Sequence, residues 1–307
     1  MALGISPLVD FAFKLILGSP EHAAVTIHFL NAILAGQPKI TRVHILNPFL
    51  GKESELAKLS VLDILATDEH GRKLNIEIQT SLPMGMSQRL TYYASRLYVE
   101  QLTEGASYVE LRPAITICVL TKSMFPQIPQ LHLDFRLREN SGQLLNDDLQ
   151  IHLLELPKLH VTAENVSSAT PIEQWAFFLL NADKLTPEEI ERLFPNSPLI
   201  EAAGVLKMIA RTPEQQQFYD ARLKFQLDEA ARLEMARFEG RTEGRTEGRA
   251  EGEEKGRVKG ELLGRVRLLL ELLEIASPTA MELETYGQGQ LAELADQLQS
   301  QLRSRGR

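Results

Sequence analysis

Residues 61–80, VLDILATDEHGRKLNIEIQT, contain two apolar-rich runs separated by a turn, and an acidic residue interrupts each run. The alternation of apolar and polar side chains predicts two β-strands, at 59–68 and 72–80. Asp63 and Glu77 stand where a buried strand ordinarily carries Val or Ile. The stretch therefore predicts a β-hairpin and the position of a polar site.

The length of the turn sets the register of the two strands. In a three-residue loop over 69–71, the glycine that ends the loop adopts the left-handed conformation, and Asp68 pairs with Arg72. Counting back along both strands then places Asp63 directly opposite Glu77, with Cβ atoms about 4.5–5.5 Å apart. We therefore expect the two carboxylates to lie side by side on the sheet.

Gln79 follows Glu77 by two residues and so lies on the same face of the strand. Two adjacent carboxylates repel each other and are costly to bury, so basic neighbours, a shared proton or a cation must neutralise them. Mg²⁺ accepts one or two carboxylates and leaves its other positions to water and phosphate. The alternative is that both acids lie at an exposed sheet edge and bind nothing.

The flanking sequence predicts a mixed α/β structure, because helical and strand patterns alternate along it. The run AITICVL has no polar face, which indicates a strand covered on both sides. Helices are predicted at 7–18, 21–34 and 86–104, and further strands at 40–47, at 114–120 and in a hairpin over 131–156.

We divide the chain into three regions. Residues 1–160 form the α/β region, and 161–238 have a largely helical pattern. Residues 239–307 begin with EGRTEGRTEGRAEGEEKGRVKG, in which glycine recurs at every fourth position from 240 to 260.

The glycine repeat is a poor helix former. Each interior glycine costs about 0.5–1 kcal/mol relative to alanine, and like charges four residues apart add nothing favourable. The repeat is therefore either a flexible linker or a helix that forms against a partner. Because an apolar helical face follows at 262–273, we expect a helical arm through which the protein forms a homo-oligomer.

Composition excludes several kinds of site. Cys118 is the one cysteine, so no internal disulfide or multi-cysteine metal site exists, and the seven histidines lack a metal-ligand spacing. The first residues lack the features of a signal peptide, and no run approaches the roughly 20 apolar residues that cross a membrane. We expect a cytoplasmic protein with no membrane association. The net charge of -8 disfavours non-specific nucleic-acid binding by the whole chain, but not a local basic patch.

An Asp in one strand followed by Glu-Ile-Gln in the next resembles the core of the PD-(D/E)XK nucleases, with Gln in the usual lysine position. More specifically, the first 160 or so residues resemble the Rpn (recombination-promoting nuclease) or PD-(D/E)XK transposase-like family of bacteria. The matching segments are DFAFK at 10–14, LDILATDEHGRKLNIEIQ at 62–79, SQRLTYYASRLYVEQLTEGASY at 87–108 and AITICVL at 114–120.

The resemblance implies a restriction-endonuclease-like α/β core, a mixed sheet flanked by helices, with an α-helical C-terminal region. It also implies a Mg²⁺-dependent DNA endonuclease associated with recombination or transposition. Asp63, Glu77 and Gln79 are the implied catalytic residues, and Asp63 and Glu77 the implied metal ligands. A glutamine hydrogen-bonds but cannot supply the positive charge of a lysine. Asp10 is a further candidate metal ligand, or forms a simple i,i+4 pair with Lys14.

DNA contacts are predicted on the helix at 86–104. Arg89, Tyr92 and Arg96 recur at three- and four-residue steps, so that arginines there could hold phosphates and a tyrosine could stack on bases. Alternatively, the tyrosines belong to the core. A protein of another class also fits the sequence: a catalytically inactive DNA-binding or scaffolding protein that acts through its C-terminal helical arm.

Overall fold

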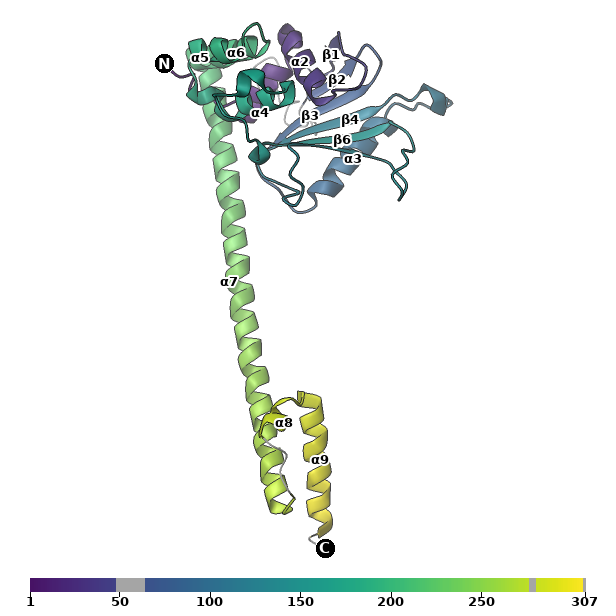
Figure 1. The fold of residues 1–307 in the computed structure, drawn as a ribbon, viewed down its shortest axis with the longest axis vertical. Helices are drawn as coiled ribbons and strands as arrows, with labels where there is room; N and C mark the ends of the chain where they lie inside the picture. Colours follow the sequence, from purple (N-terminus) through teal and green to yellow (C-terminus); the bar gives the residue numbers. More distant parts are fainter. Residues whose placement is uncertain (48–63, 276–279, 306–307) are drawn as a thin grey trace. The chain divides into compact units, whose positions relative to one another are not determined.

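The computed structural model describes residues 1–47, 64–275 and 280–305 (Figure 1). The chain forms two compact units, Met1–Ala230 and Ala231–Arg307. This division differs from the predicted boundary at 160, because Trp175 packs edge-on against Phe29, with ring centroids 5.2 Å apart. The first two predicted regions thus share one hydrophobic core.

The first unit contains a mixed six-stranded sheet with the strand order β1-β2-β3-β4-β6-β5. The strands β3, β4 and β6 are parallel, whereas β1, β2 and β3 are joined by antiparallel pairing, as are β5 and β6. This architecture confirms the predicted α/β fold. The strands are β1 (Val43–Ile45), β2 (Ile64–Asp68), β3 (Lys73–Gln79), β4 (Ala114–Leu120), β5 (His132–Arg136) and β6 (Leu149–Glu155).

The β2–β3 hairpin has the predicted register, in which Ile64 pairs with Ile76 and Thr67 with Lys73. Gly71 ends the loop with φ +79°, a conformation that strains any residue with a Cβ. Asp63 lies outside the described residues, so its pairing with Glu77 stays a prediction.

Helices cover both faces of the sheet, as Figure 1 shows. On one face, strand residues such as Ile76 and Ile117 join the main core, to which α1, α2, α4, α5 and α6 contribute. On the other face, Cys118 and Leu153 pack with Met86 and Leu90 of α3. The helices are α1 (Asp10–Leu17), α2 (Ala23–Ile33), α3 (Met86–Val99), α4 (Pro171–Asn181), α5 (Pro187–Leu193) and α6 (Leu199–Arg211).

The second unit is helical and contains the glycine repeat. Helix α7 (Pro213–Leu272) begins in the first unit and continues through the repeat, and α8 (Ala280–Glu284) and α9 (Gln288–Arg305) follow it. The repeat is helical, as the helical-arm interpretation predicted, and is not a flexible linker. In the later repeats the charges alternate favourably: Arg249 and Glu253, and Lys255 and Glu251, form i,i+4 ion pairs.

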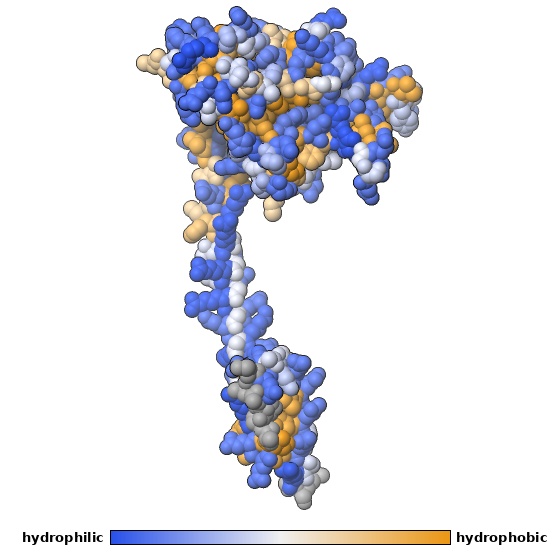
Figure 2. Space-filling view, in the orientation of Figure 1, coloured by the Kyte–Doolittle hydropathy of each residue, from blue (hydrophilic) through white to orange (hydrophobic). Residues whose placement is uncertain are grey.

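The apolar end of α7 packs within the chain. Val266, Leu269 and Leu270 are buried in a cluster with Leu291 and Leu298 of α9. Figure 2 shows orange side chains near the C-terminal end of α7, whereas the repeat is blue and white. The apolar face that favoured self-association in the sequence analysis is therefore covered by the chain itself. No helix of the described residues combines the length and the apolar character needed to cross a membrane.

Candidate functional site

A row of polar side chains occupies one face of β3. Lys73, Asn75, Glu77 and Gln79 alternate with apolar residues that enter the main core, so the four share the face that α3 partly covers. Asn75 is fully buried and Glu77 is 1% exposed, whereas Lys73 and Gln79 at the two ends are half-buried. The strand therefore brings two of the three predicted catalytic residues, Glu77 and Gln79, to one face.

Glu77 lies deep in the sheet. Its neighbour in the parallel strand β4 is Cys118, which is also buried. A buried carboxylate is stable only when hydrogen bonds or charges compensate for the lost water. Asn75 provides one such bond, because its Nδ2 donates to Glu77 Oε1 over 2.7 Å.

Helix α3 borders this polar row with its Arg89 edge. Thr91 and Ser95 line an apolar pocket with strands β5 and β6, which fixes that side of the helix at the β5 edge of the sheet. Met86 and Leu90 face the sheet. At about 100° per residue, Arg89 then lies on the flank of α3 opposite Thr91 and Ser95, which is the flank toward β3.

Arg89 is partly held in place by the protein. Its guanidinium carbon lies 5.3 Å from the centroid of the Tyr93 ring, within the range of a cation–π interaction. This interaction holds a cationic group on α3, the helix that covers part of the face with Glu77.

The other two predicted DNA contacts are more exposed. Tyr92 is 60% exposed, so the interpretation of this tyrosine as a core residue is wrong. Its ring centroid lies 5.7 Å from that of Tyr93. The Nε of Arg96 donates to Glu100 at 2.5 Å on the helix surface, and this pairing offsets part of the charge available for a phosphate.

Asp10 lies on α1 and is not part of the β3 row. Its Oδ2 is 4.0 Å from the Nζ of Lys14, as in the alternative i,i+4 interpretation. Its Oδ1 is buried and has no hydrogen-bond partner among the described residues. Asp10 and Glu77 form no hydrogen bond with each other in the described part of the chain, so a shared site stays a prediction.

The chemistry of the row suits a hard cation. Oxygen atoms of carboxylates and amides are the ligands that Mg²⁺ prefers, and Glu77 and Gln79 present such atoms on one face. The described residues contain no cluster of three or more His, Cys, Asp or Glu side chains that could hold a metal. Asp63, the second predicted ligand, falls outside them.

Sequence reasoning missed Asn75. The signal was present, because Asn75 precedes Glu77 by two residues in a strand of period two. Asn75 was not predicted as a site residue because its side chain is neutral and matches no position of the acidic motif.

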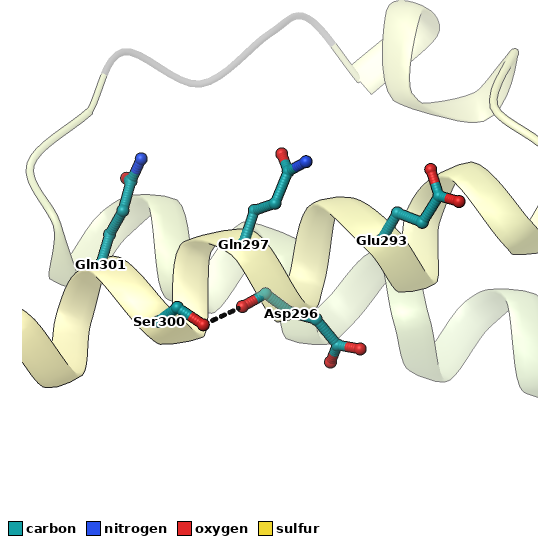
Figure 3. Close-up of a pocket in the computed structure, with 5 residues that line it drawn as sticks. All are labelled: Glu293, Asp296, Gln297, Ser300 and Gln301. Atoms are coloured by element: carbon teal, nitrogen blue, oxygen red, sulfur yellow. Dashed lines mark hydrogen bonds between the residues drawn. The ribbon is translucent and has the colours of Figure 1, made fainter.

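Another hollow lies on α9, in the second unit (Figure 3). Polar residues line it: Glu293, Asp296, Gln297, Ser300 and Gln301. The Ser300 hydroxyl donates to the backbone carbonyl of Asp296 in the same helix, with Oγ 2.9 Å from the carbonyl oxygen. The pocket has two acids and no base, and we assign it no function.

Comparison with known proteins covers residues 7–230 of the first unit and the first residues of the second. A family model described as "PD-(D/E)XK nuclease family transposase" matches residues 7–236. Neither the curated proteins nor the solved structures include a match. The matched span contains every strand of the sheet and the Glu77 row. The chain belongs to the PD-(D/E)XK nuclease family transposases.

Proposed function

We propose that this protein is a Mg²⁺-dependent DNA endonuclease that hydrolyses phosphodiester bonds during recombination or transposition. The observation that carries the proposal is the buried carboxylate of Glu77, hydrogen-bonded by Asn75 within the polar row of β3. Membership of a nuclease family supports the reaction class. A buried carboxylate near a cationic helix edge suits a reaction at a phosphate.

Each predicted residue has a role in this proposal. Glu77 and Asp63 hold the ion, which when bound supplies Lewis-acid stabilisation and an activated water. Gln79, at the end of β3, orients water or the scissile phosphate through its amide. Arg89 contacts the DNA backbone, and Tyr92 extends the contact across the exposed face of α3.

A second candidate function is that of a catalytically inactive DNA-binding or scaffolding protein. The observation that favours it is Gln79, since the neutral amide lacks the charge that a lysine contributes at this position. Under this alternative, DNA binds along α3 without being cut.

We also propose that the protein forms a homo-oligomer through α7 and acts in the cytoplasm. Because α9 covers the apolar face of α7, we assign self-association to the glycine stripe, the row of glycines at every fourth position from 240 to 264. A Cβ built at any of these glycines meets nothing within 4 Å among the described residues. Leu268 and Leu272 continue the same four-residue step and are more than half exposed.

The nuclease is tested by cleavage of supercoiled plasmid with Mg²⁺ and with EDTA. We expect Mg²⁺-dependent nicking, and we expect Asp63→Ala and Glu77→Gln each to lower its rate by more than about 100-fold. Replacing a residue that only hydrogen-bonds to a metal ligand already lowers metal affinity or activity by about 10–100-fold. Glu110→Gln, at an exposed acid, serves as the matched control. DNA binding without cleavage would support the scaffolding function, and cleavage that survives both acid substitutions would exclude this site.

A further inference from the structure

We propose that Asn75 is a positioning residue that holds the carboxylate of Glu77 in the orientation needed to bind a divalent cation. This inference rests on the proposed nuclease function and adds a residue to it. Asn75 would contact neither the cation nor the DNA, and would act through Glu77.

The contact between the two side chains is direct and buried. Asn75 Nδ2 donates to Glu77 Oε1 at 2.7 Å, and both side chains are almost completely shielded from water. The two residues are separated by one position in β3, so their side chains leave the same face of the strand. A hydrogen bond to an ionised carboxylate is stronger than one between neutral groups.

A donor at one oxygen restricts the rotation of a carboxylate. The last torsion of a glutamate side chain is broad, so a buried Glu without a donor samples many orientations. The donor at Oε1 narrows the range of this torsion and so favours one orientation of the carboxylate. Side chains that orient ligands in this way typically change metal affinity or activity by about 10–100-fold when they are removed.

The amide of Asn75 has no other visible task in the described part of the chain. Its neighbours in the adjacent strands are Leu65 and Thr116, and its Oδ1 is buried without a hydrogen-bond partner among the described residues. A side chain retained for stability would use both ends of its amide, since an unsatisfied buried polar atom is unfavourable. The hydrogen bond to Glu77 is therefore the feature that accounts for an asparagine at this position.

Thr116 provides a matched control. It lies beside Asn75 in register on β4, is equally buried, and has an Oγ1 without a hydrogen-bond partner among the described residues. Thr116→Val removes a buried polar group from the same layer of the sheet at nearly constant volume. Asn75→Leu also removes a buried polar group, one strand away, but it adds side-chain volume and removes the donor to Glu77.

The test measures Mn²⁺ binding by the full-length chain without DNA, from the electron paramagnetic resonance signal of the free ion. We expect Asn75→Leu to raise the dissociation constant by about 10–100-fold, and Thr116→Val to leave it unchanged. Circular dichroism and thermal unfolding report the fold of each variant. If Asn75→Leu does not fold, Asn75→Ala, which adds no bulk, replaces it with the same expectation.

The outcomes separate this inference from the nuclease proposal. If wild-type protein binds Mn²⁺ and Glu77→Gln abolishes binding, while folded Asn75→Leu binds as wild type does, the positioning role is overturned and the metal site stands. An equal loss in Thr116→Val would also overturn it, because any disturbance of the layer would then suffice. If wild-type protein binds no Mn²⁺, the metal site fails and the inference fails with it.

Discussion

Asp68 and Arg72 form a buried ion pair at the end of the β2–β3 hairpin, with Arg72 Nε 2.5 Å from Asp68 Oδ2. Arg72 also donates to Gln37 Oε1 and to the carbonyl oxygen of Pro38. Each of the two buried charges is therefore neutralised by the other. The pair links the hairpin to the segment that follows α2.

We expect Asp68→Ala to lower the free energy of unfolding by about 3–5 kcal/mol, because it leaves a buried guanidinium without its counter-ion. Urea unfolding of the full-length chain measures the change. In Asp68→Ala/Arg72→Met neither charge remains, so the double variant should recover part of the loss. Equal destabilisation by the single and double variants would contradict the pairing argument.

His152 gives a pH dependence of stability. Its side chain is 1% exposed, its Nδ1 lies 3.0 Å from Nε2 of His132, and burial lowers the pKa of His152 to about 4, with Asp134 opposing the shift. Because the neutral form is favoured in the folded state, its contribution is complete above about pH 6.5 and is lost as the pH falls toward 4. The full shift corresponds to about 3 kcal/mol.

Urea unfolding at pH 7.5 and pH 5 tests this effect. His152→Gln keeps hydrogen-bonding capacity but does not titrate, so the variant should lose less stability than the wild type between the two pH values. The same loss in both proteins would show that other groups dominate the acid response.

Several residues of the site follow from local pattern alone. Glu77 and Gln79 were predictable because charge and period-two spacing are visible in the sequence. The burial of Arg72 was not, since a charged residue near a turn is ordinarily solvated and its partner Gln37 is distant along the chain. Asn75 became visible only when the structure showed a complete absence of solvent around it.

At the scale of elements, the hairpin register was predictable because loop length and Gly71 determine it. The end of α3 was not. The helix was predicted to reach 104 but ends at Val99, because Gln101 exchanges two hydrogen bonds with the backbone of Arg112 and Gly105 turns the chain with φ +83°. Such a contact depends on the position of another segment, which no local pattern specifies.

The charge pattern of α7 specifies how two copies would pair. With about 100° between successive residues, Glu precedes each glycine on one flank and Arg follows on the other in the first three repeats. Two parallel helices that meet at their glycines place each Glu flank against the partner's Arg flank. An antiparallel pair places Glu against Glu and Arg against Arg, which is unfavourable. We therefore expect parallel pairing.

Oxidative cross-linking distinguishes the two arrangements. In a parallel pair, the thiols introduced by Gly240→Cys in the two chains lie close together and should form a disulfide. In an antiparallel pair, the two thiols lie far apart. Thr246→Cys is the control, because threonine lies opposite the glycines on the helix. Cys118 is buried and does not compete. Preferential cross-linking through Thr246→Cys would contradict a glycine interface.

For the whole molecule, the boundary between the two units, after Ala230, depends on helix packing that the sequence pattern did not predict. The helical pattern after residue 160 is as amphipathic as that of an independent bundle. In the structure, Trp175 and Phe178 are fully buried in the core shared with α1 and α2. The family match to residues 7–236 agrees with one unit that includes these helices.

A chain truncated after Ala230 tests this division. Residues 1–230 contain the sheet, the helices on both of its faces and the Glu77 row, so we expect a soluble, cooperatively unfolding protein that retains any Mg²⁺-dependent nicking. The truncated chain lacks the glycine stripe and should be monomeric by light scattering at concentrations where the full-length chain self-associates. Truncation after residue 160 should instead expose the apolar surface that Trp175 and Phe178 cover, and yield aggregated protein. A folded 1–160 fragment would show that α4 to α6 are not part of the nuclease core.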